Sequence, residues 1–448
     1  MIYQIQADNN EVNNFNLQKW LGLFKTLIQP KRIKLGQYYD GENKIIKQGA
    51  VDGRPNYSVN VNLAKYITDV VTGYTFGKDV TYSTDNENQQ TLLEKIEYIN
   101  KVVKSNEVDF NVGGDLSCYG IGYQMVIVKE GSEPLENRII LKRLKPETTF
   151  YVVDNTILNE PLYGIYFYDY WQDNQLKTKV YVYDKEYLYL FDGFQDNVML
   201  TSVEPHNMGY IPIIQCLNND DAFGDYQQIT DLLDSLSLTM SNFTDDMQSI
   251  ANAFLGIHGA ILNDGGVEEI NKTKVMNMPV GSSAEWVVKN INTEGEKLQI
   301  DNLLKFIFQI SQVPDLTDDS FGGTQTGVAM RYKLWGIDQL WTTKVKKYTL
   351  AIYQRLKIFL HLLQYQIESS VQLEQDIILT FYKNLPLDNS ETYQMVQALK
   401  GTVSEKTLLT NIPIVKDVQA EIEQIDEERE KEADTYKFDN AEDNINDI

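Results

Sequence analysis

At 448 residues the chain is long enough for two to four structural modules. Hydrophobic residues make up 42% and charged residues 23%, which are the proportions of an ordinary globular protein. No apolar run approaches the roughly 20 residues that a bilayer requires, and no basic cluster precedes an apolar stretch at the start. We therefore expect no membrane span, no membrane partner and no secretory leader.

The charge is strongly acidic, with 40 Lys and Arg against 64 Asp and Glu, a net of −24. A protein that binds DNA through its phosphates needs a basic surface. This acidic composition therefore favours a protein that does not bind DNA tightly. Acidic charge that simply keeps a protein dispersed is an equally open interpretation. No basic residue lies between Lys185 and Lys272, whereas residues 417–448 carry thirteen acidic and three basic side chains. That last segment predicts a helix passing into disorder.

Signatures of enzymes and metal sites are missing from the sequence. It contains no GxxxxGK[ST], GxSxG, HExxH or EF-hand pattern, and its histidines are far apart. Cys118 and Cys216 lie in apolar stretches, which predicts buried thiols. The acidic piece NNDDAFGD lacks calcium-loop spacing, so a turn with a helix cap is favoured there over a divalent site. We expect no catalysis, no cofactor and no metal.

The first half of the chain mixes helices with a sheet. Residues 16–29 have helical spacing that Pro30 should end, and NVNLAKYITDVVTGYTFG predicts a helix packed through Leu63, Ile67 and Val71. From 121 to 200 the alternating β-formers, including YQMVIV, YGIYFYDYW and KVYVYD, predict an antiparallel sheet.

The second half predicts a pair of long helices joined by a small module. Over 222–253 the apolar side chains fall on one stripe from Ile229 to Ile250, and the other side carries Asp225, Asp231, Asp234, Asp245 and Asp246. Short β-like pieces follow over 254–291. A capping box at Thr293 and Glu296 then opens a helix over 292–314.

A glycine-containing connection over 315–327 leads into a basic helix from 328 to about 367, in which Gly336 predicts a bend. Its cations are Arg331, Lys333, Lys344, Lys346, Lys347, Arg355 and Lys357. We expect them to pair with acidic surfaces of a neighbouring subunit, although Trp335 and Trp341 among them leave a DNA-binding interpretation open. A strand, DIILTFYKN, and short helices complete the chain.

Four stretches resemble one known family. They are YYDGENKI, VNLAKYITDVVTGYTFGKDV, the segment HNMGYIPIIQCLNNDDAFGDYQQITDLLDSLSLTMSNFTDDMQSIANAFL, and VPDLTDDSFGGTQTGVAMRYKLWGID. In this order they resemble the portal proteins of long-tailed phages of Gram-positive hosts, from about Leu21 to Glu430. LKGTVSEKTLLTNIPIVKD is similar to the C-terminal region of that family. Two departures are Thr326, where serine is expected, and the short acidic tail after Asp434.

The resemblance implies an α+β portal fold with a wing, a two-helix stem, a small α/β clip, a long kinked wing helix and a helical C-terminal crown. Its expected divisions are an N-terminal region and wing over 1–221, a stem helix over 222–253, the clip over 254–291, a second stem helix over 292–314, a tunnel loop over 315–327, the long wing helix over 328–375 and the crown over 376–448.

The implied function is a ring, expected to be a dodecamer, at the capsid vertex, through which double-stranded DNA is packaged and ejected. The implied partners are further copies of the chain, the terminase large subunit, a head-completion or adaptor protein, and capsid and scaffolding proteins. The implied location is the virion, with the host cytoplasm during assembly. A different virion connector or head-completion protein, and a nucleic-acid enzyme, are the alternative functions.

The candidate site residues fall in three groups. The stem candidates for lining the DNA channel are Asp231, Asp234, Asp245 and Asp246, with the apolar stripe packing between adjacent subunits. The tunnel-loop candidates are Asp318, Asp319, Phe321, Gly322, Gly323, Thr324, Gln325, Thr326 and Gly327. The clip candidates for partner docking are Asn263, Asp264, Lys272 and Lys274.

Overall fold

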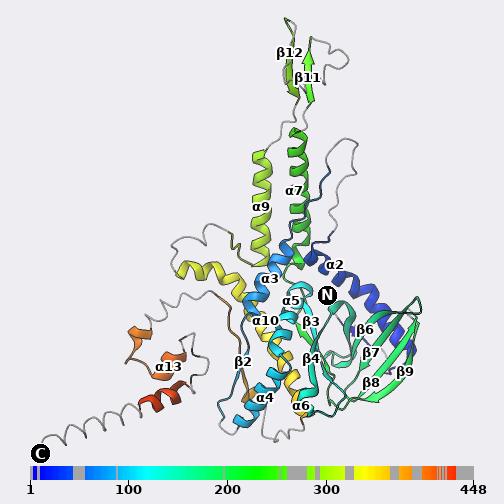
Figure 1. The fold of residues 1–448 in the computed structure, drawn as a ribbon, viewed down its shortest axis with the longest axis vertical. Coiled ribbons are helices and arrows are strands. Elements are labelled where there is room, and N and C mark those ends of the chain that lie inside the picture. Colours follow the sequence, from blue (N-terminus) through cyan, green and yellow to red (C-terminus); the bar gives the residue numbers. More distant parts are fainter. Residues whose placement is uncertain are drawn as a thin grey trace, which may run out of the picture. The chain divides into compact units, whose positions relative to one another are not determined.

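The computed structural model describes residues 4–7, 11–43, 56–86, 89–194, 197–251, 254–259, 280–287, 293–317, 327–363, 373–385, 396–410, 412, 415, 418 and 421–429 (Figure 1). The chain forms two compact units, Met1–Asn384 and Leu385–Ile448. Both helices and strands are present, which confirms the expected α+β class.

The N-terminal helical stretch continues past Pro30. Helix α1, Asn14–Leu23, is capped by Asn13, whose side-chain oxygen accepts from the backbone N–H of Asn16 at 2.9 Å. A π-helical turn, Phe24–Ile28, joins it to α2, Gln29–Asp40. The prediction that Pro30 ends the helix is wrong, because the proline lies in the first turn of α2, where a missing N–H costs little.

A six-stranded sheet packs against α1. Its order is β1 (Ile5–Gln6), β5 (Thr149–Val153), β6 (Pro161–Gln172), β7 (Gln175–Tyr183), β8 (Tyr187–Phe194) and β9 (Asn197–Pro205). Strand β1 is parallel to β5, and the other neighbours are antiparallel. The Phe24 ring stacks on that of Phe150 with centroids 4.4 Å apart, and both side chains are fully buried.

The sequence predicted one antiparallel sheet over residues 121–200, but the strands of this region belong to two sheets. Strands β3 (Ile121–Val128) and β4 (Ile139–Leu144) belong to a separate three-stranded sheet with β10 (Ile213–Leu217). The two sheets are separate layers because both faces of strand β3 are buried. Val126 faces the helical core, whereas Tyr123 packs in a second core with Tyr151 of β5. This sheet is therefore a middle layer between the helices and the larger sheet.

The helical core surrounds α10. It contains α3 (Leu63–Phe76), α4 (Gln90–Val102), α5 (Ser105–Tyr119), α10 (Gly327–Leu362) and the strand pair β2 (Thr81–Ser83) and β13 (Ile378–Thr380). Of the three residues predicted to pack this helix, Ile67 and Val71 are buried and Leu63 is half-buried. Helix α10 is continuous in its hydrogen bonding, and its first turns run at an angle to the rest (Figure 1).

The remaining elements are small. Strands β11 (Phe254–His258) and β12 (Ser283–Val287) form an antiparallel pair in the region expected to be the clip. In the C-terminal unit, α13 spans Glu405–Thr410 and residues 421–429 are helical. Arg429 pairs with Glu405 at 2.7 Å in that unit. The acidic tail over 430–448 lies outside the described residues.

Both cysteines are buried thiols, as predicted. The side chains of Cys118 and Cys216 are free of disulfides. The Cys118 thiol lies 2.8 Å from the Tyr226 hydroxyl. Burial raises the pKa of Cys118 to about 12, so this thiol stays protonated and unreactive near neutral pH.

An ion pair lies at the centre of the helical core. Arg355 of α10 is fully buried and contacts Asp109 of α5 at 2.5 Å. Its other donors reach Gln124 at 3.1 Å and the Tyr82 hydroxyl at 3.2 Å, and Tyr348 donates to Asp109 at 2.6 Å. Apart from Arg355 Nε, which has no hydrogen-bond partner among the described residues, the network joins α10 and α5 to strands β3 and β2.

Removing the guanidinium would leave the Asp109 charge buried and unpaired. We expect Arg355→Met to lower the free energy of unfolding by about 3–5 kcal/mol, measured by urea denaturation with circular dichroism. Lys357→Met is the control, since its partner Glu374 is exposed, and it should cost less than about 1 kcal/mol. Equal losses from the two variants would contradict this account.

Candidate functional site: the acidic helix α7 and its partner α9

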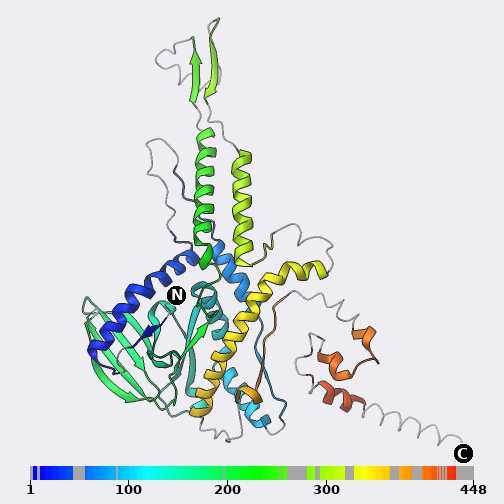
Figure 2. The same cartoon turned by 180° about the vertical axis from the view of Figure 1, so that it is seen from behind.

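Helices α7 (Thr230–Ala251) and α9 (Thr293–Ser311) lie side by side, as Figures 1 and 2 both show. Gln299 of α9 donates to the Thr239 hydroxyl of α7 at 3.2 Å. At the base of the pair, the Tyr66 ring of α3 meets the Phe308 ring edge-on at 5.9 Å, and Ile307 is fully buried. This end of α9 is thus attached to the core.

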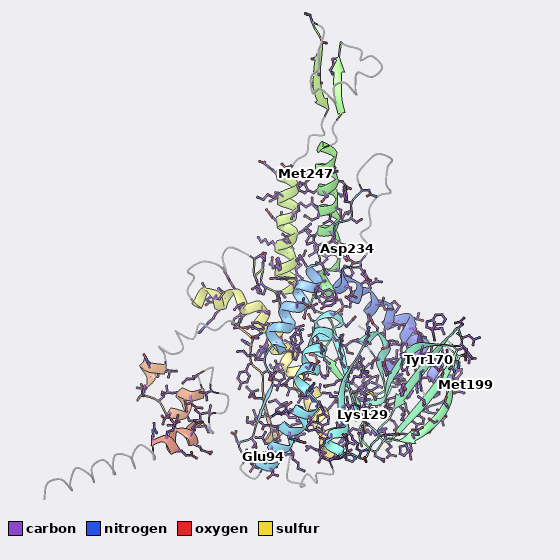
Figure 3. All side chains as sticks on the ribbon, viewed as in Figure 1. Glu94, Lys129, Tyr170, Met199, Asp234 and Met247 are labelled. Carbon is purple, nitrogen blue, oxygen red and sulfur yellow. The ribbon has the colours of Figure 1, made fainter. Side chains whose placement is uncertain are left out.

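The apolar stripe of α7 is buried mainly at its base. Ile229, Leu233 and Leu236 are almost fully buried within this chain, whereas Met247, further along the helix, is 46% exposed (Figure 3). Helix α7 begins at Thr230 rather than near 222, because a turn and a short 3-10 helix over Gln227–Ile229 precede it. The base of the stripe therefore serves the fold of the subunit itself.

The predicted channel aspartates differ in their surroundings. Asp231 is exposed, and Asp245 and Asp246 are half-buried. Asp234 accepts hydrogen bonds from the Tyr38 hydroxyl at 2.7 Å and from Asn43 at 3.2 Å. Burial, reinforced by Asp234, raises the pKa of Tyr38, so the phenol remains a neutral donor. The two hydrogen bonds hold the Asp234 side chain in place.

A second, polar face of α7 was not predicted. The backbone N–H groups of Tyr57, Val59 and Val61 donate to Asp245 at 2.7 Å, to Ser241 at 2.9 Å and to Ser237 at 3.3 Å. These acceptors are spaced four residues apart, so they form one row along the helix. Residues 57–61 therefore lie extended along α7. The row of small polar residues was visible in the sequence, but its partner was not.

Two aspartates in the turn before α7 form ion pairs with lysines of the same chain. Lys344 of α10 is buried and contacts Asp225 at 2.8 Å, and it also donates to Asn218. Lys347 pairs with Asp220. The predicted turn over this acidic piece is confirmed.

These contacts change the interpretation of the basic helix. The cations Lys344, Lys347, Arg355 and Lys357 pair with carboxylates of their own chain. The expectation that the cations pair with a neighbouring subunit is therefore wrong for Lys344 and Arg355, which are buried in their own chain. Among the seven cations, Arg331 and Lys346 remain solvent-exposed.

Other predicted residues lie outside the part of the chain that the structure describes. These are the tunnel-loop candidates Asp318, Asp319, Phe321, Gly322, Gly323, Thr324, Gln325 and Thr326, and the clip candidates Asn263, Asp264, Lys272 and Lys274. Gly327 is the first residue of α10. Among the described residues, no three His, Cys, Asp or Glu side chains gather in a way that would hold a metal ion. None of the described helices has the length and apolar character needed to cross a bilayer.

Comparison with known proteins decides the family. The family model described as phage portal protein, SPP1 Gp6-like, matches residues 26–435. The chain belongs to this phage portal protein family. The portal protein of Bacillus phage SPP1 is 25% identical over 435 residues, which cover 87% of this chain and 79% of the relative. A chain from the neck of an empty GTA particle, computed with C6 symmetry, aligns with a TM-score of 0.46 at 12% identity, covering 78% of this chain and 89% of that one.

As a portal family member, the protein is a virion component and a head-tail connector. The family match spans α7, α9 and α10, so the helical pair and the long helix lie within the region common to the family. The resemblance found in the sequence is thereby confirmed.

The serine row of α7 can be tested by hydrogen exchange. Ser241→Ala removes the acceptor of the Val59 amide, so we expect that amide to exchange about five- to tenfold faster, equivalent to ~1 kcal/mol. Ser235→Ala is the matched control, because Ser235 is exposed and donates only within its helix, to the carbonyl of Asp231. An unchanged Val59 rate in Ser241→Ala would show that the contact does not hold the segment.

Proposed function

We propose that copies of this chain close into a ring, expected to be a dodecamer, at one capsid vertex, and that double-stranded DNA passes through its bore during packaging and ejection. The observation that carries the proposal is the portal family match over residues 26–435. Assembly would take place in the host cytoplasm. The long helices α7 and α9 supply the elements expected of a stem.

The charge of α7 suits a wall that must not hold DNA. The helix carries Asp231, Asp234, Asp245 and Asp246 and no basic residue. DNA that bound strongly to the wall would stall in both directions, because phosphate affinity comes from cationic side chains. We place these four aspartates around the bore. Asp231, which is exposed, is the most direct candidate to face the DNA.

Contacts between subunits need an apolar surface that the single chain leaves uncovered. Helix α9 has such a row: Leu298, Phe306 and Ile310 are exposed and lie at helical spacing. The base of the α7 stripe is buried in its own chain, so α9, together with Met247 of α7, is the better surface for a neighbouring copy.

Further partners follow from the family. The connection over 315–327 would act as a tunnel loop that touches DNA. Residues of the clip, with Asn263, Asp264, Lys272 and Lys274 as candidates, would dock the terminase large subunit during packaging and a head-completion or adaptor protein afterwards. The β-rich wing would face capsid and scaffolding proteins.

Ring formation is tested by imaging the purified protein. We expect annular particles by negative-stain electron microscopy, and fewer of them for Ile310→Asp, because the charge would enter an apolar interface between subunits. Gln309→Asp adds the same charge at an adjacent exposed position and should form more rings than Ile310→Asp. If the wild-type protein stays monomeric at all concentrations and salt conditions, the proposed function fails.

The role of the bore charge is tested by DNA packaging. We expect Asp231→Lys to slow packaging while rings still form, because a cation at the wall attracts phosphates. Glu94→Lys makes the same charge change on α4, far from α7 (Figure 3), and should package normally. Normal packaging by Asp231→Lys would remove this residue from the bore.

A further inference from the structure

The first described turns of α10, residues 329–335, stand away from the rest of the unit Met1–Asn384 (Figures 1 and 2). We call this segment the arm. It carries two large aromatic side chains in solvent, Tyr332 at 76% and Trp335 at 64% exposure. Exposed aromatics at a projecting helix end are a poor arrangement for a free monomer, since each can bury about 150–250 Å² in a contact.

The direction of the arm is fixed where it leaves the core. A Cβ at Gly336 would lie 2.8 Å from the backbone oxygen of Gln312, just after the end of α9. Only glycine permits so close a crossing. The arm therefore starts from a tight packing contact, which presents Trp335 and Tyr332 in a defined direction.

A cavity of about 250 Å³ opens beside α3 and α5. Its lining includes Thr68, Thr72, Phe110, Gly114, Asp115 and Arg143. Phe110 is 44% exposed, which places an aromatic ring at the surface of the cavity. The volume corresponds to roughly eight water molecules, enough room for a side chain rather than a single solvent molecule.

The cavity wall contains polar groups with unused hydrogen-bonding capacity. Thr68 and Thr72 are 2% and 5% exposed, and their hydroxyls have no hydrogen-bond partner within the described part of the protein. Asp115 is already engaged by Arg143, at 2.6 and 2.5 Å. A buried hydroxyl without a partner is costly. The cavity thus suits a group with an apolar body and an N–H or O–H donor, which describes tryptophan and tyrosine.

We propose that the arm of one copy inserts Trp335, with Tyr332 beside it, into the α3–α5 cavity of the next copy. The proposal rests on the proposed ring function. The arm carries Arg331 and Lys333, whereas the cavity lining holds two carboxylates, Asp69 and Asp115, against one cation, Arg143. Arm and cavity are different surfaces of one chain, so the contact is head-to-tail, which is the type of contact that a cyclic ring repeats between successive subunits.

Gly114 provides a test that leaves the fold intact. A Cβ at this position would meet nothing within 4 Å, and glycine is unfavourable inside a helix. Gly114→Leu should therefore fill the cavity while the thermal melting of the monomer stays unchanged or rises. We expect it to raise the concentration for half-maximal ring assembly roughly thirtyfold or more, as Trp335→Ala should.

Two controls separate this contact from general effects. Gly22→Leu fills open space on α1, and Leu350→Ala trims an exposed side chain further along α10. Both should assemble like the wild type. Wild-type rings together with normal assembly of Gly114→Leu would overturn this contact alone, whereas absence of wild-type rings would overturn the proposed function as well.

A cross-linking experiment locates the contact directly. A photoreactive phenylalanine analogue replaces Tyr332, assembled rings are irradiated, and the joined peptides are identified by mass spectrometry. Cross-links between subunits to residues 63–76 or 105–119 would support the proposal. The same analogue at Tyr98, exposed on α4, should not reach those helices in another subunit. Cross-links from position 332 to other segments only would refute the proposal even if Gly114→Leu failed to assemble.

Discussion

The buried pair of Lys344 and Asp225 determines how the long helix of the core meets the base of α7. Each side chain is 2% exposed, so neither charge could be accommodated there alone. Burial lowers the pKa of Lys344, and the Asp225 carboxylate acts in the opposite direction. Because Asp225 belongs to the turn that precedes α7, the pair ties α10 to the start of α7, and the backbone N–H of Asp225 also donates to the Ser117 carbonyl at 2.8 Å.

The helices that could be predicted from the sequence are those whose apolar residues recur at helical spacing within the helix itself. The apolar spacing of α3, α7 and α9 revealed their existence and the buried faces of Ile67, Val71, Leu233 and Leu236. The continuation through Pro30 was missed, because a proline in the first turn of a helix looks the same in sequence as one that ends it. The family itself was evident from four short stretches, since their order is a stronger signal than any one of them.

The partners of charged side chains could not be predicted. A cation on α10 and a carboxylate on α5 or before α7 are more than 100 positions apart, and periodicity carries no information on which pairs meet. The same limit applies to the candidate site. The aspartates of α7 were found by composition, but the binding of Asp234 by Tyr38 and of Asp245 by the Tyr57 amide depends on where α2 and residues 57–61 lie.

The burial of both native thiols has a practical consequence for work on the assembled particle. The sequence contains two cysteines, and neither Cys118 nor Cys216 reaches the surface of the subunit. Burial also holds the pKa of each above its usual value, which suppresses the thiolate that reacts with maleimides. A cysteine introduced at any exposed position would be the sole reactive thiol of its subunit, so fluorescent dyes or spin labels can report on movements within a natively folded chain without prior removal of the natural cysteines.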